Sequence, residues 1–466
     1  MQKNKIFILL PDGVGLRNFA YSEFHAIGKR ENFDVVFWNN TPFSLSELGF
    51  KEIKIQNSKS HPLTDIYKNA RKHIELNRFI KITKDRVYDT YRFPFSFSTL
   101  KKAIKSSITK SIIITYSSGK GLREIREKIK EKERKTLYYH QSLETLQKEK
   151  PEMVFCTNQR PITAIAPLLA AQQLGIPTAT FVFSWDNLPK ATMVVETDYY
   201  FVWSDHMKLE LLYYYPYVRE EQVFVTGTPQ FEPHYDKSNL LSREVFFKHN
   251  GLHLNKKYIC YSGDDSTTCP DDPKYLSDVA TAVRELNSAG NSLGIIFRRC
   301  PVDFSDRFDE VLENNKDIIN VIAPKCEKIG EGWNTVLPLH TDLNLQINTI
   351  YHTEMVINLG SSMVFDYVAH KKPCAFINYD VTKKVFQNWS VTKIYKYIHF
   401  RSMPNNNSVL WIDSLDSITG IIKKGMATNP SVIKDAQQWF EIINQHPPQE
   451  ASKRIWEGIK TVICKE

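Results

Sequence analysis

The sequence lacks any long uninterrupted run of apolar residues. No window approaches the roughly 18 to 20 apolar residues of a membrane-spanning helix. The apolar part of the N-terminal stretch KNKIFILLPDG is about five residues long, which is shorter than the roughly 7 to 15 of a signal peptide. We therefore interpret this stretch as the first strand of a cytoplasmic protein.

Cysteines are few, and none is closely paired with another. The seven cysteines include no C-x-x-C pair: Cys156, Cys260, Cys269, Cys300, Cys326, Cys374 and Cys464. This spacing argues against a disulfide framework and a zinc site, and it fits a reducing compartment. No D-x-D pair stands convincingly at the end of a strand, and hard cations need several converging oxygens. The sequence thus predicts no metal and no resident cofactor.

Low-complexity tracts and internal repeats are also absent from the 466 residues. With 42% hydrophobic, 12% aromatic and 24% charged residues, the composition is that of a globular protein. The length exceeds that of one ordinary core. We therefore expect two domains of roughly 200 residues each.

Positive charge is unevenly distributed within a net charge of +9. Residues 101–135 carry twelve Lys and Arg against four Glu, and the aromatic stretch YDTYRFPFSF, residues 88–97, lies just before them. Aromatic side chains beside a basic amphipathic segment suit an anionic membrane surface, where each cation contributes about 1 kcal/mol. Residues 85–135 are therefore a candidate membrane-facing segment, which would place the protein peripherally on the inner face of the plasma membrane. For 121–135, a solvated helix with paired Glu and Lys is an equal alternative. We find no signature of a nucleic-acid-binding module and expect no nucleic-acid partner.

Short apolar runs alternate with helical patterns along the chain, which indicates βαβ units and parallel sheets. The strands expected in the first half are Ile6–Leu10, Asp34–Trp38, Met153–Cys156, Thr178–Phe183, Tyr200–Trp203 and Val223–Thr226, with helices over 15–30, 64–80, 120–148 and 161–174. Those expected in the second half are Tyr258–Ser262, Gly294–Arg298, Ile319–Ile322, Met355–Asn358, Ala375–Asn378 and Leu410–Ile412. We predict an N-terminal domain over 1–236, a linker near 235–255, a C-terminal domain over 254–430, and a helical tail over 431–466 that could cross back to the first domain.

The stretch VINLGSSMVFDYVAHKKPCAFINYD, residues 356–380, predicts a buried strand, a turn, a helix and a second buried strand. Gly360 allows close approach of the backbone, and Ser361 and Ser362 place hydroxyls beside the free amides of the first helical turn. This arrangement is typical of an anion site, usually for phosphate. Asp366, one turn further in, could accept hydrogen bonds from a ribose diol. The alternative is a serine N-cap with Asp366 interacting with the helix dipole.

This spacing resembles the donor-binding signature of nucleotide-sugar-dependent glycosyltransferases of the GT-B architecture. Where many of those enzymes have His two residues before the Gly, this chain has Asn358. Further segments resemble a bacterial branch that acts on surface polysaccharide or lipopolysaccharide: LPDGVGLRNF (10–19), FSWDNLPKATMVVETDYYFVWSD (183–205), VFVTGTPQFEPHYD (223–236), YSGDDSTTCPDDPKYL (261–276) and IIFRRCPVD (295–303). The C-terminal half also resembles the glycerophosphate polymerases of teichoic acid synthesis. The resemblance implies an α/β fold of two facing Rossmann-like domains with a deep interdomain cleft.

Several residues are candidate donor ligands. Arg298 and Arg299 follow the strand GIIF, and an Arg fork matches phosphate oxygens bidentately, although arginines at strand ends are often solvated. His340, at the start of a predicted helix, could lie against the nucleotide base. Asp380 ends the strand after the GSS helix, where related enzymes bind hydroxyls of the donor sugar.

An inverting transferase also needs a base that takes the proton of the acceptor hydroxyl. Asp12, at the end of the first strand in PDGVG, is the first candidate, with Gly13 and Gly15 leaving room for an acceptor. Asp186, in SWDNL, is the second. Either aspartate could instead cap a turn or a helix, which is common for D-G and D-N pairs. His234, in the predicted linker, is ambiguous between a base and a packed histidine.

We therefore expect a metal-independent glycosyltransferase that moves a sugar from a nucleotide-activated donor to a saccharide or lipid-linked acceptor in bacterial surface polysaccharide synthesis. One alternative is a sugar-nucleotide epimerase or hydrolase of the same fold, which would turn over its substrate without an acceptor. The others are a glycerophosphotransferase and a non-catalytic nucleotide-binding module at a membrane surface.

Overall fold

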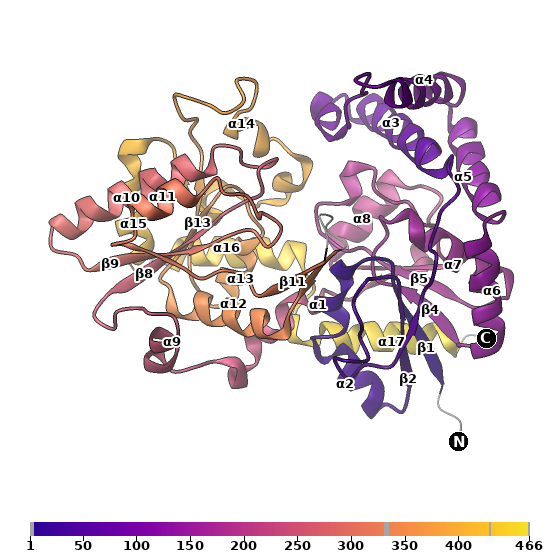
Figure 1. The fold of residues 1–466 in the computed structure, drawn as a ribbon, viewed down its shortest axis with the longest axis horizontal. Coiled ribbons are helices and arrows are strands. Elements are labelled where there is room, and N and C mark those ends of the chain that lie inside the picture. The colour runs from indigo at the N-terminus through magenta and orange to yellow at the C-terminus, as the bar shows by residue number, and fades with distance from the viewer. Residues whose placement is uncertain (1–3, 330–334, 428–429, 465–466) are drawn as a thin grey trace. The chain divides into compact units, whose positions relative to one another are not determined.

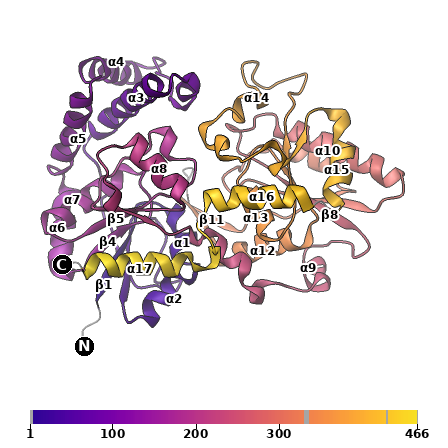
Figure 2. The ribbon, with the colours of Figure 1, turned by 180° about the vertical axis from the view of Figure 1, so that it is seen from behind.

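The chain divides into two compact units, each built on one large parallel sheet. The computed structural model describes residues 4–329, 335–427 and 430–464. Unit 1 holds the described residues up to Pro229 and those from Ile443 onwards, and unit 2 holds those from Gln230 to Ile442. Figures 1 and 2 show the units from opposite sides. The predicted fold class, α/β with two Rossmann-like domains, is confirmed.

The sheet of unit 1 has seven strands in the order β3-β2-β1-β4-β5-β6-β7, the doubly wound order with β1 and β4 at its centre. Its strands are apolar and mostly buried because helices cover such sheets on both faces. They are β1 (Lys5–Leu10), β2 (Asp34–Asn39), β3 (Glu52–Lys54), β4 (Met153–Cys156), β5 (Thr178–Phe181), β6 (Tyr199–Val202) and β7 (Val223–Val225). The sequence predicted all of these strands except β3.

The helices of unit 1 begin mostly at Ser or Thr residues whose hydroxyls accept hydrogen bonds from free amides of the first turn. They are α1 (Leu16–Phe19), α2 (Glu23–Arg30), α3 (Thr64–Thr83), α4 (Leu100–Thr115), α5 (Gly119–Glu133), α6 (Leu137–Glu149), α7 (Ile165–Gln173), α8 (Asp205–Tyr214) and α17 (Ala451–Ile463). The predicted helix over 120–148 is two helices, because the Thr136 hydroxyl caps a new helix by accepting from the Tyr139 amide.

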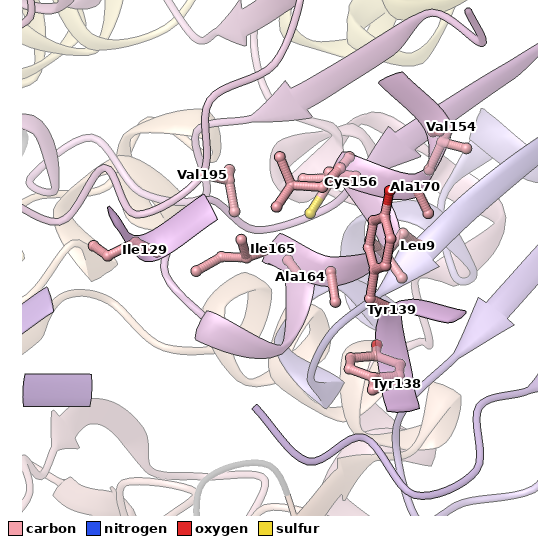
Figure 3. Packing of buried hydrophobic residues seen from close by; sticks show 14 of the residues in the cluster. Leu9, Ile129, Tyr138, Tyr139, Val154, Cys156, Ala164, Ile165, Ala170 and Val195 are labelled. Atoms are coloured by element: carbon pink, nitrogen blue, oxygen red, sulfur yellow. The ribbon is translucent and has the colours of Figure 1, made fainter. Parts of the chain in front are cut away.

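One core of unit 1 lies between the central strands and helices α5 to α7 (Figure 3). Leu9, Val154 and Cys156 contribute from the strands, and Ile129 and Ile165 from the helices. All five side chains are buried. This core fixes the carboxyl ends of β1 and β4, where the candidate residues of unit 1 follow.

The C-terminal helix α17 completes unit 1. Trp456 stacks on Phe24 at 4.9 Å and on Phe33 at 4.8 Å between ring centroids, and its indole nitrogen donates to the Phe24 carbonyl at 2.7 Å. A side chain at Gly28 would overlap with this indole, so the glycine is needed for close packing. The sequence analysis allowed for this return of the tail to the first domain.

The sheet of unit 2 has six strands in the order β10-β9-β8-β13-β14-β15, beside a separate β11-β12 hairpin. The strands are β8 (Lys257–Ser262), β9 (Leu293–Arg298), β10 (Ile319–Val321), β11 (Cys326–Lys328), β12 (Val336–Pro338), β13 (Val356–Asn358), β14 (Cys374–Ile377) and β15 (Leu410–Ile412). The helices are α9 (Arg243–His249), α10 (Asp272–Ser288), α11 (Asp309–Asn314), α12 (His340–His352), α13 (Met363–Ala369), α14 (Val391–Ile394), α15 (Ile418–Met426) and α16 (Pro430–Ile443). The sequence did not predict the hairpin.

The unit boundaries differ from the predicted domain boundaries. Residues 230–236, which we assigned to the first domain, lie in unit 2, and so does most of α16, which we assigned to the tail. The physical reason is aromatic packing: Phe231 lies edge-on to Phe440 of α16 at 4.7 Å between ring centroids. No helix within the described residues is long and apolar enough to cross a membrane.

Candidate functional site

Asp12 follows β1 at the carboxyl edge of the unit 1 sheet, where ligands bind in folds of this kind. Its carboxylate accepts hydrogen bonds from the Val14 amide at 3.2 Å and from the Asn158 side-chain amide at 2.9 Å. Burial raises the pKa of Asp12, partly offset by those hydrogen bonds and by the positive charge of Arg160. The aspartate caps the 3-10 turn Gly13–Gly15, as the alternative interpretation proposed, and it is also a carboxylate of raised basicity.

A chain of amides joins Asp12 to the second candidate base. Asn158 is followed in the chain by Gln159, whose side-chain nitrogen donates to the Asn187 Oδ1 at 2.9 Å. The Asn187 Nδ2 donates in turn to Asp186 at 2.8 Å. The structure thus brings Asp12 and Asp186 into one polar network at the ends of β1, β4 and β5.

Asp186 has two ionisable neighbours that we did not predict from the sequence. Lys190, one helical turn later, forms an ion pair with it. Burial, and then the charge of Asp186, raises the pKa of Glu210 on α8 to about 8. A carboxyl group with this pKa is mostly protonated at neutral pH and can act as a proton donor. Only its burial, which a single sequence does not reveal, could have identified Glu210.

Cations also converge near this edge. The pKa of Lys72, on α3, is lowered to about 8 by burial and by the neighbouring positive charges of Arg160, Lys190 and Lys68. Like charges in proximity favour binding of an anion, because the anion relieves their repulsion. This edge of unit 1 therefore combines carboxyl groups with a local excess of positive charge.

Gly15 does not leave room for an acceptor, contrary to our expectation. A Cβ atom at this position would overlap with the Thr157 side chain, and Thr157 donates to the Leu9 carbonyl at 3.1 Å. The glycine therefore allows the β4–α7 loop to approach the first turn. That approach places the neighbouring Asn158 against Asp12.

In unit 2, Arg298 ends β9 and is almost completely buried. Its Nη2 donates to both carboxylate oxygens of Asp342, at 2.7 and 2.8 Å. Its Nη1 is buried and has no hydrogen-bond partner among the described residues. An unpaired buried donor on a charged group is costly, so this nitrogen marks a place where an anionic oxygen would be stabilised.

The GSS turn has the strand–turn–helix form that the sequence predicts. Gly360 adopts a φ of +65°, and a Cβ atom there would lie 2.9 Å from the Phe400 ring. Asn358 shapes the turn by accepting from the Ser361 amide at 2.9 Å, and the Ser361 hydroxyl accepts from the Met363 amide at 3.4 Å. The Ser361 hydroxyl therefore satisfies the first amide of α13, whereas Ser362, the N-cap residue, makes no side-chain capping hydrogen bond to a described residue. A phosphate role for Gly360, Ser361 and Ser362 stays a prediction.

Asp366 is held by a histidine rather than exposed at the helix start. Its carboxylate accepts from the His234 Nε2 at 2.8 Å, with 0% and 3% of the His234 and Asp366 side chains exposed. The His234 Nδ1 lies 3.1 Å from the His370 Nε2. Burial, with the nearby charges of His234 and Lys372, lowers the pKa of His370 to about 4. This chain of side chains fixes α13 to the segment that opens unit 2, and a contact between Asp366 and ribose stays a prediction.

The remaining predicted donor ligands lie in different surroundings. The Arg299 guanidinium donates to the Ser305 carbonyl at 2.6 Å, which stabilises the loop after β9. His340 is the exposed first residue of α12. Asp380 accepts from the Val391 amide at 2.9 Å and from Lys384 at 2.7 Å, so it orders the loop before α14. Their roles as donor ligands stay predictions.

Comparison with known proteins defines the fold of the chain. No family model matches the sequence, and no curated protein is similar to it. A putative UDP-N-acetylglucosamine 2-epimerase from Listeria monocytogenes is similar in structure with a TM-score of 0.56 at 12% identity, over 100% of this chain and 98% of that one. A glycosyltransferase from Rickettsia africae has a TM-score of 0.53 at 12% identity over 100% of both chains. S. aureus MnaA, in a co-structure with UDP, has a TM-score of 0.53 at 15% identity over 99% of this chain and 97% of that one.

These likenesses support the GT-B-like fold that the resemblance implied, and they include a putative epimerase and a glycosyltransferase. None of the three is a glycerophosphotransferase, so that resemblance stays a prediction. Within residues 4–329, 335–427 and 430–464, no group of three or more His, Cys, Asp or Glu side chains could hold a metal ion.

Proposed function

We propose that the protein is a glycosyltransferase that moves a sugar from a nucleotide-activated donor to a saccharide or lipid-linked acceptor. The observation that carries this proposal is Asp12: a carboxylate whose pKa is raised by burial, held in place by Val14 and Asn158 at a sheet edge. A base with raised pKa accepts a hydroxyl proton more readily. The amide network to Asp186 supplies polar groups that could orient the hydroxyls of an acceptor.

The donor would bind to unit 2 through its diphosphate. The buried Arg298 Nη1 would donate to a phosphate oxygen, and its positive charge would stabilise the negative charge that develops on the departing diphosphate. The Arg298–Asp342 ion pair supports this role because it fixes the guanidinium plane before any ligand arrives.

A sugar-nucleotide 2-epimerase is the second candidate. Two features favour it: the likeness to the Listeria protein and the raised pKa of Glu210 near Asp186. An epimerase needs an acid and a base but no acceptor. The two functions therefore differ in whether the sugar nucleotide is converted in the absence of an acceptor.

The test begins with a thermal-shift screen against UDP-, GDP-, CDP- and dTDP-sugars and CMP-linked sugars. Each nucleotide that stabilises the protein is then incubated with it in D2O, without acceptor, and followed by proton NMR. A transferase leaves the sugar ring unexchanged, whereas an epimerase exchanges a ring proton for deuterium and forms a second sugar. Exchange would overturn the transferase proposal, and stabilisation by no nucleotide would overturn both.

A further inference from the structure

Helix α4 has an unusual distribution of side chains for a helix on a globular unit. Its fully buried positions are the small polar residues Ser106 and Thr109, and Ile112 and Ile113 near its end pack, partly buried, against the core of unit 1. Its exposed positions include Leu100, Ile104 and Ile108, which are 79%, 52% and 40% exposed. These three residues are spaced by four and therefore form one ridge along the helix. A helix that belongs only to a folded core would bury that ridge and expose the polar residues.

Lysines flank this apolar ridge. Lys101, Lys102, Lys105 and Lys110 are exposed, and the α4 sequence LKKAIKSSITKSIIIT contains no acidic residue. One of the four charges is compensated, because Lys105 pairs with Asp65 of α3. The face is therefore both apolar and positively charged.

Exposed aromatic side chains precede α4 in the chain. Phe93 and Phe97, in the segment before α4, are 71% and 54% exposed. The Lys110 ammonium lies over the Phe97 ring at 4.8 Å, and the Lys72 ammonium lies over the Phe93 ring at 4.4 Å. Phe93 also lines a hollow of about 240 Å³, whose wall includes Lys72 and Lys102 together with the buried Ser106 and Thr109 of α4. Cations at the wall of a hollow with an aromatic rim suit the phosphate of a lipid headgroup.

We propose that this face, formed by α4 and residues 93–97, docks unit 1 on a bilayer that contains anionic phospholipids. The ridge and the two phenylalanines would enter the boundary between headgroups and acyl chains, and the lysines would remain at the phosphates. The combination of apolar and cationic side chains favours an anionic bilayer as the partner. The lysines would gain nothing from an uncharged lipid surface, and the exposed apolar ridge would gain nothing from a purely acidic protein surface. Figures 1 and 2 show α4 beside α3 at the end of unit 1 opposite the chain termini.

This inference does not depend on the proposed reaction, because docking is measured without a substrate. The test uses the full-length protein in flotation assays with phosphatidylcholine vesicles, with and without phosphatidylglycerol, at low and high salt. We expect binding only with phosphatidylglycerol, and weaker binding at high salt.

Two double variants of α4 and two control variants of α6 distinguish a loss of docking from a general loss of structure. The double variant Leu100→Ser with Ile104→Ser, and the double variant Lys101→Glu with Lys102→Glu, should each lower the vesicle partition coefficient at least about tenfold. The matched controls Leu137→Ser and Lys148→Glu, exposed on α6, should bind as the wild type does. Thermal unfolding midpoints show whether each variant is folded.

Three results would overturn the proposal. Equal binding to vesicles with and without phosphatidylglycerol would show that the charge of the lipid does not contribute to binding. If both α4 variants bind vesicles as strongly as the wild type, this face is not the docking surface. A change of sedimentation coefficient in the α4 variants, without any vesicle binding by the wild type, assigns the face to a second copy of the chain instead.

Discussion

Asp12 combines a position fixed by the Asn158 hydrogen bond with a pKa that burial raises. Replacing Asp12 by Asn removes the acceptor for a proton, so we expect turnover to fall by about 10² to 10⁴ with little change in donor affinity. The measurement is a transfer assay together with donor calorimetry. In the wild type, kcat/KM should rise with pH through the raised pKa of Asp12, since only the deprotonated carboxylate can accept the proton.

Asp186 is the rival base and is tested by Asp186→Asn. This change removes one partner of Lys190 and keeps the size of the side chain. If Asp12 is the base, Asp186→Asn should retain most of the turnover. Lost turnover in Asp186→Asn with normal turnover in Asp12→Asn would reverse the assignment.

Arg298 is best tested by a change that keeps its ion pair. Arg298→Lys retains a positive charge beside Asp342 but lacks the second guanidinium nitrogen. We expect donor affinity to fall by about 10- to 150-fold, because a charge-assisted hydrogen bond contributes about 1.5 to 3 kcal/mol. The control is Arg284→Lys, at an exposed arginine of unit 2 that pairs with Asp317. Equal affinity in Arg298→Lys and the wild type would exclude a phosphate contact at Nη1.

Asp366→Ala alone cannot test the ribose contact, because it also leaves His234 without its partner. We expect Asp366→Ala and His234→Ala each to lower the free energy of unfolding by about 1 to 3 kcal/mol, since each variant leaves the other side chain of the pair buried without this hydrogen bond. If Asp366 also binds ribose, only Asp366→Ala should weaken donor binding once both proteins are measured well below their unfolding midpoints. Equal donor affinity in the two variants would make Asp366 a packing residue only.

At the scale of elements, α17 contributes a large side chain to the core of unit 1. Trp456→Ala should lower the free energy of unfolding of that unit by about 3 to 5 kcal/mol, because it leaves a cavity between Phe24 and Phe33. Hydrogen exchange by mass spectrometry should show the loss in β1 and β2 before any loss in unit 2. The control is Glu457→Ala, an exposed position on the same helix. Uniform loss of protection in both units would contradict the assignment of α17 to unit 1.

The elements that the sequence predicted are those with a strong local signal. The buried parallel strands are short apolar runs, and Met153–Cys156 and Leu410–Ile412 were predicted to the residue. Helix α4 was recognised as a basic amphipathic segment, but which of its faces is buried depends on α3 and could not be read from the chain. The same distinction applies to the site residues: those with a local sequence signal were predicted, and those defined by distant neighbours were not. Asp12 ends a predicted strand, whereas Glu210 acquires its pKa only from burial and from Asp186.

At the scale of the whole molecule, the boundary between the two units lies at a different place in the chain than the sequence suggested. We expected the connector near 235–255 to be a linker, yet Phe246 and Phe247 lie in a core of unit 2, and His234, just before the connector, is buried against Asp366. A histidine between Pro and Tyr in a Pro-rich stretch has no local partner, so a single sequence gives no sign of this contact. A linker assigned from composition alone can therefore be part of a folded core.

The return of the chain through α17 also bears on how the protein is made. Ribosomes deliver a polypeptide from its N-terminus, and domains generally fold in that order as they emerge. Here the last helix packs into the first unit, with Arg454 donating to the Thr226 carbonyl at 2.8 Å and Asn444 accepting from the Thr228 amide at 2.9 Å. Unit 1 therefore cannot be completed until α17 has been synthesised, and unit 2, encoded in between, is the first of the two whose residues have all been delivered. A ribosome that stalls before Trp456 would release a chain with a complete second unit and an unfinished first one.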